Sequence, residues 1–249
     1  MPYRLLCITA HPDDESGAFG GALLTAHRDG VETSLLCLTD GQAAHYRDGV
    51  EDGKELGRRR RAELAEACKL LGVTQHEVLH YPDGALLRQD FYTLVGEMTE
   101  RIRRSRPHVV LTFGGDGSVN LHRDHTVVSA AATAAFHWAA RPEFFPEQEL
   151  QPYAPQKLYY ASPPLVTVRG RPELSDAPTV PYSLTLELGE FAGRKMEAFR
   201  LHSSQAGVLE RVKAIVEPLM STERYLLAAA PGRVDVRQDA GFFDGVVED

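Results

Sequence analysis

The sequence predicts an α/β fold, with a mostly parallel sheet and helices on both of its faces. Its 249 residues are 43% hydrophobic and 25% charged, a composition typical of a globular domain, which excludes disordered, collagen-like and coiled-coil chains. Short apolar runs alternate with amphipathic segments through the first half of the chain, and glycines stand in several connections. This alternation is typical of right-handed βαβ units, whose strands pair in parallel.

Four strands are predicted in this half. Residues 5–9 form a continuous apolar run, as expected of a strand that is covered on both faces. The other three strands are expected at residues 31–39, about 76–81 and 108–113.

Helices are predicted between these strands. Residues 54–71 carry an apolar stripe at Leu64, Cys68 and Leu71, the spacing of one helix face, and this helix is expected to end at Gly72. The other helices of this half are expected at residues 17–29, about 89–104 and about 122–140.

The chain changes character between residues 141 and 181, where nine of its 15 prolines lie. We expect loops there, with edge strands near 157–161 and 182–187, and then helices at 189–202 and 206–219. No internal repeat or low-complexity linker divides the chain. The sequence therefore predicts a single Rossmann-like domain over residues 1–249, with an irregular proline-rich excursion.

The formal net charge is −8, which disfavours nucleic acid as a partner. Three cysteines without a CxxC pair are too few for a disulfide framework. The N-terminal apolar stretch is too short for a signal peptide, and the longest small-apolar run falls short of the ~20 residues of a membrane span. We expect a cytoplasmic protein without a membrane span, and the oligomeric state stays open.

Two polar clusters follow predicted parallel strands, at the end of the sheet where open α/β folds bind ligands. The first reads AHPDDE and follows the strand at 5–9; the second reads NLHRDH and follows the fourth strand. Each holds two potential metal ligands at positions i and i+3, which a helical turn brings to the same side: His11 with Asp14, and His122 with His125.

Imidazole and carboxylate groups are ligands of catalytic zinc, which uses three protein groups and leaves one position for water. The metal lowers the pKa of that water from about 15.7 toward about 7, and Asp13 is placed to accept the proton. Each cluster alone also has a structural explanation, because Asp13 or Asp14 can cap a helix. The four candidates are one ligand too many for an open zinc site, and their spacing does not decide which three bind.

Two competing motifs are rejected. Residues 76–80 match HExxH, which binds zinc only on a helix. Gly72 and Pro82 bound a strand-like segment here, and i to i+4 along a strand spans about 13 Å, too far for two ligands of one zinc. A dinucleotide site would need GxGxxG after the first strand, and the glycines of HPDDESGAFGG do not fit it.

The AHPDDE motif, paired with HxDH about 110 residues later, resembles the LmbE-like / PIG-L family of zinc-dependent N-deacetylases. The resemblance covers roughly residues 3 to 205. Further segments that resemble the family are Thr39–Gly41, Arg60–Glu63, Leu71–Val73, Tyr81–Gly84, Arg106–Val110 and Lys195 with His202–Gln205.

The resemblance implies a site. His11, Asp14 and His125 would hold Zn²⁺, or another divalent metal such as Fe²⁺, and Asp13 would be the general base. His122 would stabilise the tetrahedral oxyanion or protonate the leaving amine.

Four further residues are candidates for orienting a ligand or binding substrate: Asp124, Arg60, Arg123 and His202. Asp124 orients a histidine or caps a helix. Arg123 stands where the family's HPDH motif has proline, and it either adds positive charge beside the substrate entrance or is a plain exposed arginine. The cluster of four arginines at 58–61 suggests an anionic substituent on the substrate, or a solvated helix face with Arg60 turned into the site.

The reaction implied is amide hydrolysis, in which a zinc-bound water, deprotonated by Asp13, attacks an N-acetyl carbonyl and releases acetate. The resemblance implies a small N-acetylated sugar substrate of the N-acetylglucosamine type. Two alternatives remain: an amidase of thiol–sugar conjugates with the same zinc site, and a non-catalytic Rossmann-like protein that binds a sugar or nucleotide.

Overall fold

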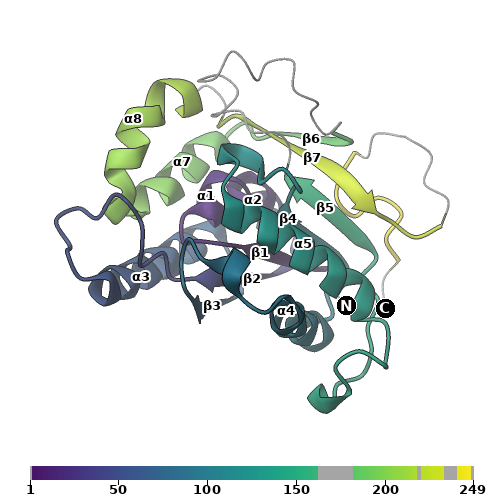
Figure 1. Cartoon of the computed structure of the whole chain (residues 1–249). Coiled ribbons are helices and arrows are strands. Elements are labelled where there is room, and N and C mark those ends of the chain that lie inside the picture. The colour runs from purple at the N-terminus through teal and green to yellow at the C-terminus, as the bar shows by residue number, and fades with distance from the viewer. Residues whose placement is uncertain (1, 162–181, 218–219, 233–239, 248–249) are drawn as a thin grey trace.

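The computed structural model describes residues 2–161, 182–217, 220–232 and 240–247 (Figure 1). Part of the proline-rich excursion, residues 162–181, lies outside the described residues. Among those that are described, no helix is long and apolar enough to cross a membrane. Cys7, Cys37 and Cys68 are all buried and free, as expected of small apolar core residues.

A seven-stranded sheet forms the centre of the described molecule, in the order β3-β2-β1-β4-β5-β7-β6. The first five strands of this order run parallel, and β7 is antiparallel to both β5 and β6. The strands are β1 (Arg4–Thr9), β2 (Glu32–Thr39), β3 (Gln75–Tyr81), β4 (Val109–Phe113), β5 (Lys157–Ala161), β6 (Leu184–Glu187) and β7 (Thr222–Ala229). The predicted mostly parallel α/β architecture is confirmed.

The structure corrects two strand predictions. The segment 157–161 was expected at an edge, yet β5 lies inside the sheet between β4 and β7. No strand was expected at 222–229, because Glu223 and Arg224 interrupt its apolar residues. Glu223 is nevertheless buried, where it accepts hydrogen bonds from the N–H groups of Gly21 and Ala22.

Helices cover both faces of the sheet, with α4 and α5 on one side and α2, α3 and α7 on the other (Figure 1). They are α1 (Asp14–Gly17), α2 (Gly20–Arg28), α3 (Gly53–Leu71), α4 (Phe91–Ser105), α5 (Arg123–Trp138), α7 (Phe191–Leu201) and α8 (Ala206–Val216). The helix expected over 17–29 begins later, at Gly20, and a separate short helix, α1, precedes it. The chain breaks at Phe19, whose fully buried ring packs edge-on against Phe113.

Local chemistry explains where α3 begins and ends. The Asp52 carboxylate accepts the N–H of Lys54 at the first turn. Gly72 ends the helix with φ 75°, and a Cβ there would lie 2.2 Å from the ring of His27. The expected stripe of Leu64, Cys68 and Leu71 is buried.

The sheet brings the two polar clusters together. β1 pairs with β2 on one side and with β4 on the other, so the strand order reverses at β1. Leu5 pairs with Val109 and Cys7 with Leu111, which places the carboxyl ends of β1 and β4 side by side. This is the switch point at which open parallel sheets bind ligands.

Candidate active site

Asp14 lies at the centre of the site, at the start of α1, just after the turn that follows β1. Its Oδ2 accepts the N–H groups of Ala10, at 3.2 Å, and His11, at 2.7 Å. Two imidazoles also face this carboxylate: His11 Nδ1 lies 3.5 Å from Oδ2, and His125 Nε2 lies 3.1 Å from Oδ1. Burial raises the pKa of Asp14, but His125 and His11 outweigh it and hold the pKa well below its ordinary value.

His125 comes from the first turn of α5 and stacks on Phe113, with ring centroids 3.9 Å apart. Its Nδ1 lies 3.0 Å from the carbonyl oxygen of Gly117. A carbonyl only accepts, so Nδ1 carries the proton and the neutral ring has a lone pair on Nε2. This buried Nε2 has no hydrogen-bond partner among the described residues, although Asp14 lies beside it.

His11 has the same arrangement with its nitrogens exchanged. Its Nε2 lies 3.1 Å from Asp83 Oδ1 and 3.3 Å from Asp124 Oδ2, and these carboxylates accept its proton. The Nδ1 lone pair is then left facing Asp14. Burial lowers the pKa of His11, but the carboxylates of Asp124, Asp14 and Asp83 raise it well above its ordinary value. Without an ion the ring therefore favours a second proton on Nδ1, and a metal ion would take the place of that proton.

These groups fit a metal ion. Lone pairs of two imidazoles and one carboxylate converge, an arrangement that is repulsive unless a cation lies between them. Two ligands of one tetrahedral ion, each at about 2.1 Å, are about 3.4 Å apart, and the distances from Asp14 to His125 and His11 are 3.1 and 3.5 Å. A carboxylate behind a ligating histidine is also common at metal sites, as Asp124 and Asp83 are here.

His122 is the third imidazole of the cluster. Nitrogen atoms of His11, His122 and His125 lie within 4.8 Å of one another. His122 is the N-cap residue of α5, and its Nδ1 accepts the N–H of Asp124 at 3.2 Å, so its proton is on Nε2. Burial lowers the pKa of His122, and His11 and His125 lower it further. The ring is therefore neutral, with an N–H that can be donated.

Asp13 is held in an unusual conformation, with φ 109°. Arg60 fixes its carboxylate: Nη2 donates to Asp13 Oδ2 at 3.1 Å and to the carbonyl of Pro12, while Nη1 donates to the carbonyl of Gly41. Burial raises the pKa of Asp13 to about 6, against the opposing effect of Arg60. A carboxylate with this pKa is a stronger base than an ordinary aspartate.

The other arginines of the 58–61 cluster are engaged elsewhere. Arg58 pairs with Glu55, Arg59 with Asp48 and Glu63, and Arg61 with Asp40. Only Arg60 turns toward the predicted ligands and base.

The remaining candidates are placed as follows. Asp124 contacts His11 and also accepts the N–H groups of Gly84 and Leu86. Arg123 is exposed at the start of α5. His202 is buried, and its Nε2 lies 2.6 Å from Glu15 Oε1. Its side chain makes no hydrogen bond with His11, Asp14 or His125.

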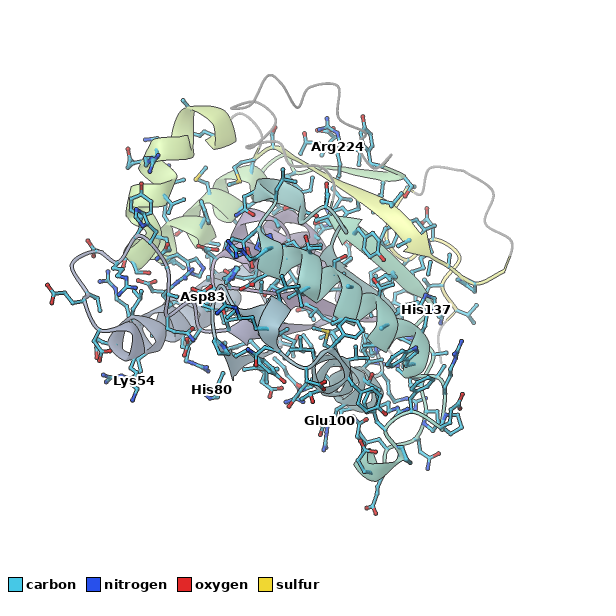
Figure 2. All side chains as sticks on the ribbon, viewed as in Figure 1. Lys54, His80, Asp83, Glu100, His137 and Arg224 are labelled. Atoms are coloured by element: carbon cyan, nitrogen blue, oxygen red, sulfur yellow. The ribbon has the colours of Figure 1, made fainter. Side chains whose placement is uncertain are left out.

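Sequence reasoning missed Asp83 as a site residue. It follows β3 in the segment Tyr81–Gly84, which was noted for its resemblance only. Its place at the carboxyl end of a third parallel strand is the signal that could have found it. In Figure 2, Asp83 lies toward the loops at the centre of the molecule, whereas His80 lies at its outer side. His76 and His80 are both exposed on strand β3, which confirms that their HExxH motif is not a zinc site of the helical kind.

A family model described as "PIG-L: GlcNAc-PI de-N-acetylase" matches residues 6–136, more than half of the chain. The chain belongs to this family. The match contains both polar clusters, and the expectation of a de-N-acetylase-type hydrolase is thereby confirmed.

Similar proteins agree with this assignment. The chain is 29% identical over 295 residues to a 1D-myo-inositol 2-acetamido-2-deoxy-alpha-D-glucopyranoside deacetylase of Streptomyces scabiei, covering 98% of this PIG-L chain and 90% of the relative. It is 30% identical over 177 residues to a mycothiol S-conjugate amidase of Streptomyces coelicolor, covering 63% and 60% of the two chains.

Solved structures show the same fold. The N,N'-diacetylchitobiose deacetylase of Pyrococcus horikoshii is 21% identical, with a TM-score of 0.74 over 91% of this chain and 84% of that one. A 4-carboxy-2-hydroxymuconate hydratase of Pseudomonas putida is 20% identical, with a TM-score of 0.69 over 94% and 99%. The fold therefore also occurs in a protein named for a different reaction, and the chemistry has to be argued from the site.

Proposed function

We propose that this chain is a zinc-dependent deacetylase that hydrolyses the acetamido group of an N-acetylglucosamine unit to acetate and a free amine. The observation that carries the proposal is the convergence of the His125 Nε2 and His11 Nδ1 lone pairs on the Asp14 carboxylate, beside a separate, half-buried carboxylate, Asp13. Metal ligands next to a base that does not bind the metal are the set that hydrolysis of an amide requires.

His11, Asp14 and His125 would hold the metal, and Fe²⁺ would suit the same donors as Zn²⁺. When bound, the ion polarises the amide carbonyl and lowers the pKa of a water molecule. Asp124 and Asp83 accept the Nε2 proton of His11, which keeps the Nδ1 lone pair directed at the ligand position.

The residues of the chain then move the protons. Asp13 accepts a proton from the attacking water on its carboxylate, which Arg60 keeps in place. His122 donates its Nε2–H to the oxygen that becomes negative, because its Nδ1 is engaged by the N–H of Asp124. The proton held by Asp13 passes to the departing nitrogen, so that one water and one amide give acetate and an amine.

The substrate class is proposed from the relatives, which deacetylate a glucosaminide or, in one case, cleave a mycothiol conjugate. A small N-acetylated sugar is therefore the expected partner. An amidase of thiol–sugar conjugates is the second candidate, since the amidase relative is 30% identical and the same catalytic groups would serve it.

The test is product analysis on the purified, metal-loaded chain with an N-acetylglucosaminyl inositol and with a thiol–sugar conjugate. We expect acetate and a free amine, detected by proton NMR, from the first compound. Release of a larger acid from the second compound alone would show the amidase instead. Substrate that binds without turnover would contradict both, as would full activity in both Asp13→Ala and His125→Ala.

A further inference from the structure

Different residues fix the main chain and the side chain of Asp13. A φ of 109° is left-handed, a conformation that residues with a Cβ rarely adopt, and such strain persists only where the surroundings fix it. The Asp13 N–H donates to Glu15 Oε2 at 3.0 Å. Glu15 is thus a second constraint on Asp13, acting through the main chain, whereas Arg60 acts through the side chain.

Glu15 is itself fixed with little freedom. Its side chain is 0% exposed, and Oε1 lies 2.6 Å from His202 Nε2, which is 0% exposed as well. Ser16 Oγ donates to the same oxygen at 2.5 Å. Burying a carboxylate costs free energy unless it is paired. Helix α1, at whose start Glu15 lies, is only four residues long, and a helix this short does not by itself account for a buried ion pair.

A second buried carboxylate anchors the same part of the chain and provides a control. Glu63 accepts hydrogen bonds from Ser203 Oγ, Ser204 N and Ser204 Oγ, at 2.6 to 2.8 Å. The turn that begins at His202 is therefore attached to the core by both Glu15 and Glu63. Of the two carboxylates, only that of Glu15 accepts a hydrogen bond from Asp13.

We propose that Glu15 and His202 are positioning residues for Asp13: His202 fixes the carboxylate of Glu15, and Glu15 fixes the left-handed backbone of Asp13, so that the base faces the attacking water. This inference rests on the proposed function, in which Asp13 is the base. It assigns a role to Glu15, which neighbours the predicted ligand Asp14 but has both oxygens engaged by Asp13 N, Ser16 and His202.

The test compares Glu15→Ala, Glu15→Gln and Glu63→Gln for kcat, KM, bound metal and crystal structure. In Glu15→Ala we expect kcat to fall about 10- to 100-fold, as for groups that orient catalytic residues, with KM and metal content unchanged and Asp13 out of the left-handed region. Glu15→Gln keeps an acceptor for the Asp13 N–H, so it should retain most of kcat. Glu63→Gln should keep both kcat and the Asp13 conformation.

Wild-type kcat in Glu15→Ala, or an Asp13 that stays at φ near 109° in its crystal structure, would overturn the inference. So would an equal loss of kcat in Glu63→Gln, because the effect would then belong to the whole turn. If Glu15→Ala does not fold, His202→Ala takes its place, with the same expected split between kcat and KM. A wild type without deacetylase activity would refute the proposed function alone, since the crystal structures still decide whether Glu15 fixes Asp13.

Discussion

At the residue scale, the site depends on which atom of each side chain is already engaged. Gly117 engages His125 Nδ1, Asp83 and Asp124 face His11 Nε2, and an N–H of α5 engages His122 Nδ1. These second contacts separate the two histidines whose lone pairs face Asp14 from the one that keeps an N–H to donate. The sequence contained the candidates, but it could not give these tautomers. For His122 and His125 they depend on how the local backbone folds, and for His11 on carboxylates far along the chain.

One prediction separates the base from the ligands. Asp13→Asn should keep the metal and lose at least about 100-fold in kcat, the usual scale of general-base catalysis. His125→Ala should lose the metal together with the activity. Elemental analysis alongside kinetics measures both quantities, and loss of metal in Asp13→Asn would place Asp13 among the ligands instead.

A second prediction concerns the carboxylates behind His11. Asp83→Asn and Asp124→Asn should each weaken metal binding about 10- to 100-fold, because a neutral amide supports the imidazole less strongly. Competition with a chelator measures the affinity. Asp48→Asn, which alters an exposed partner of Arg59, is the matched control and should bind metal like the wild type. Unchanged affinity in both site variants would exclude the proposed role.

At the element scale, the sequence predicted the segments whose signal is local. The apolar run of β1 and the stripe of α3 with its terminal glycine were found because caps and periodicity are written in neighbouring residues. β7 was missed because Glu223 interrupts its apolar pattern. Besides the nearby Tyr225 hydroxyl, the groups that satisfy Glu223 are distant in the sequence: Lys195 and the N-terminus of α2. The break at Phe19 was missed for a similar reason, since tertiary packing decides it.

The end of α3 gives a stability prediction. Gly72→Ala should destabilise the protein by more than the roughly 1–2 kcal/mol that a left-handed alanine costs, because the new Cβ would lie 2.2 Å from the ring of His27. Gly49→Ala is the matched control, because Gly49 has φ 79° and open space around it. It should lose only the free energy that the left-handed conformation costs an alanine. Urea unfolding measures the difference, and equal losses would mean that the contact with His27 is relieved.

The buried ion pair of β7 gives a second stability prediction. Lys195 and Glu223 are both buried, so Lys195→Met should cost about 3–5 kcal/mol by leaving the buried carboxylate without a cationic partner. Lys213→Met removes a partly exposed partner of Glu210, 3.9 Å away, and should change stability by less than about 1 kcal/mol. Thermal unfolding compares the two variants. A small effect of Lys195→Met would show that the N–H groups at the start of α2 and the Tyr225 hydroxyl suffice for Glu223.

At the scale of the whole molecule, the reversal of strand order at β1 gathers residues that are more than 100 positions apart in the sequence. The first cluster follows β1, Asp83 follows β3, and His122 and His125 follow β4. The contacts of His11 with Asp83 and of Asp14 with His125 bring them together at one end of the sheet. The two motifs predicted this meeting because parallel strands share their carboxyl end. The extent of a single domain over 1–249 stays a prediction.

The central claim is that one divalent ion, held where the lone pairs of His11, Asp14 and His125 converge, makes this chain a deacetylase. Titrating Zn²⁺ into metal-free protein while measuring acetate release tests it most directly. We predict that activity rises from near zero and levels off at one equivalent of metal, and that His125→Ala shows no such rise. Acetate release by metal-free protein at the full rate, or a rise that needs two equivalents, would contradict the claim.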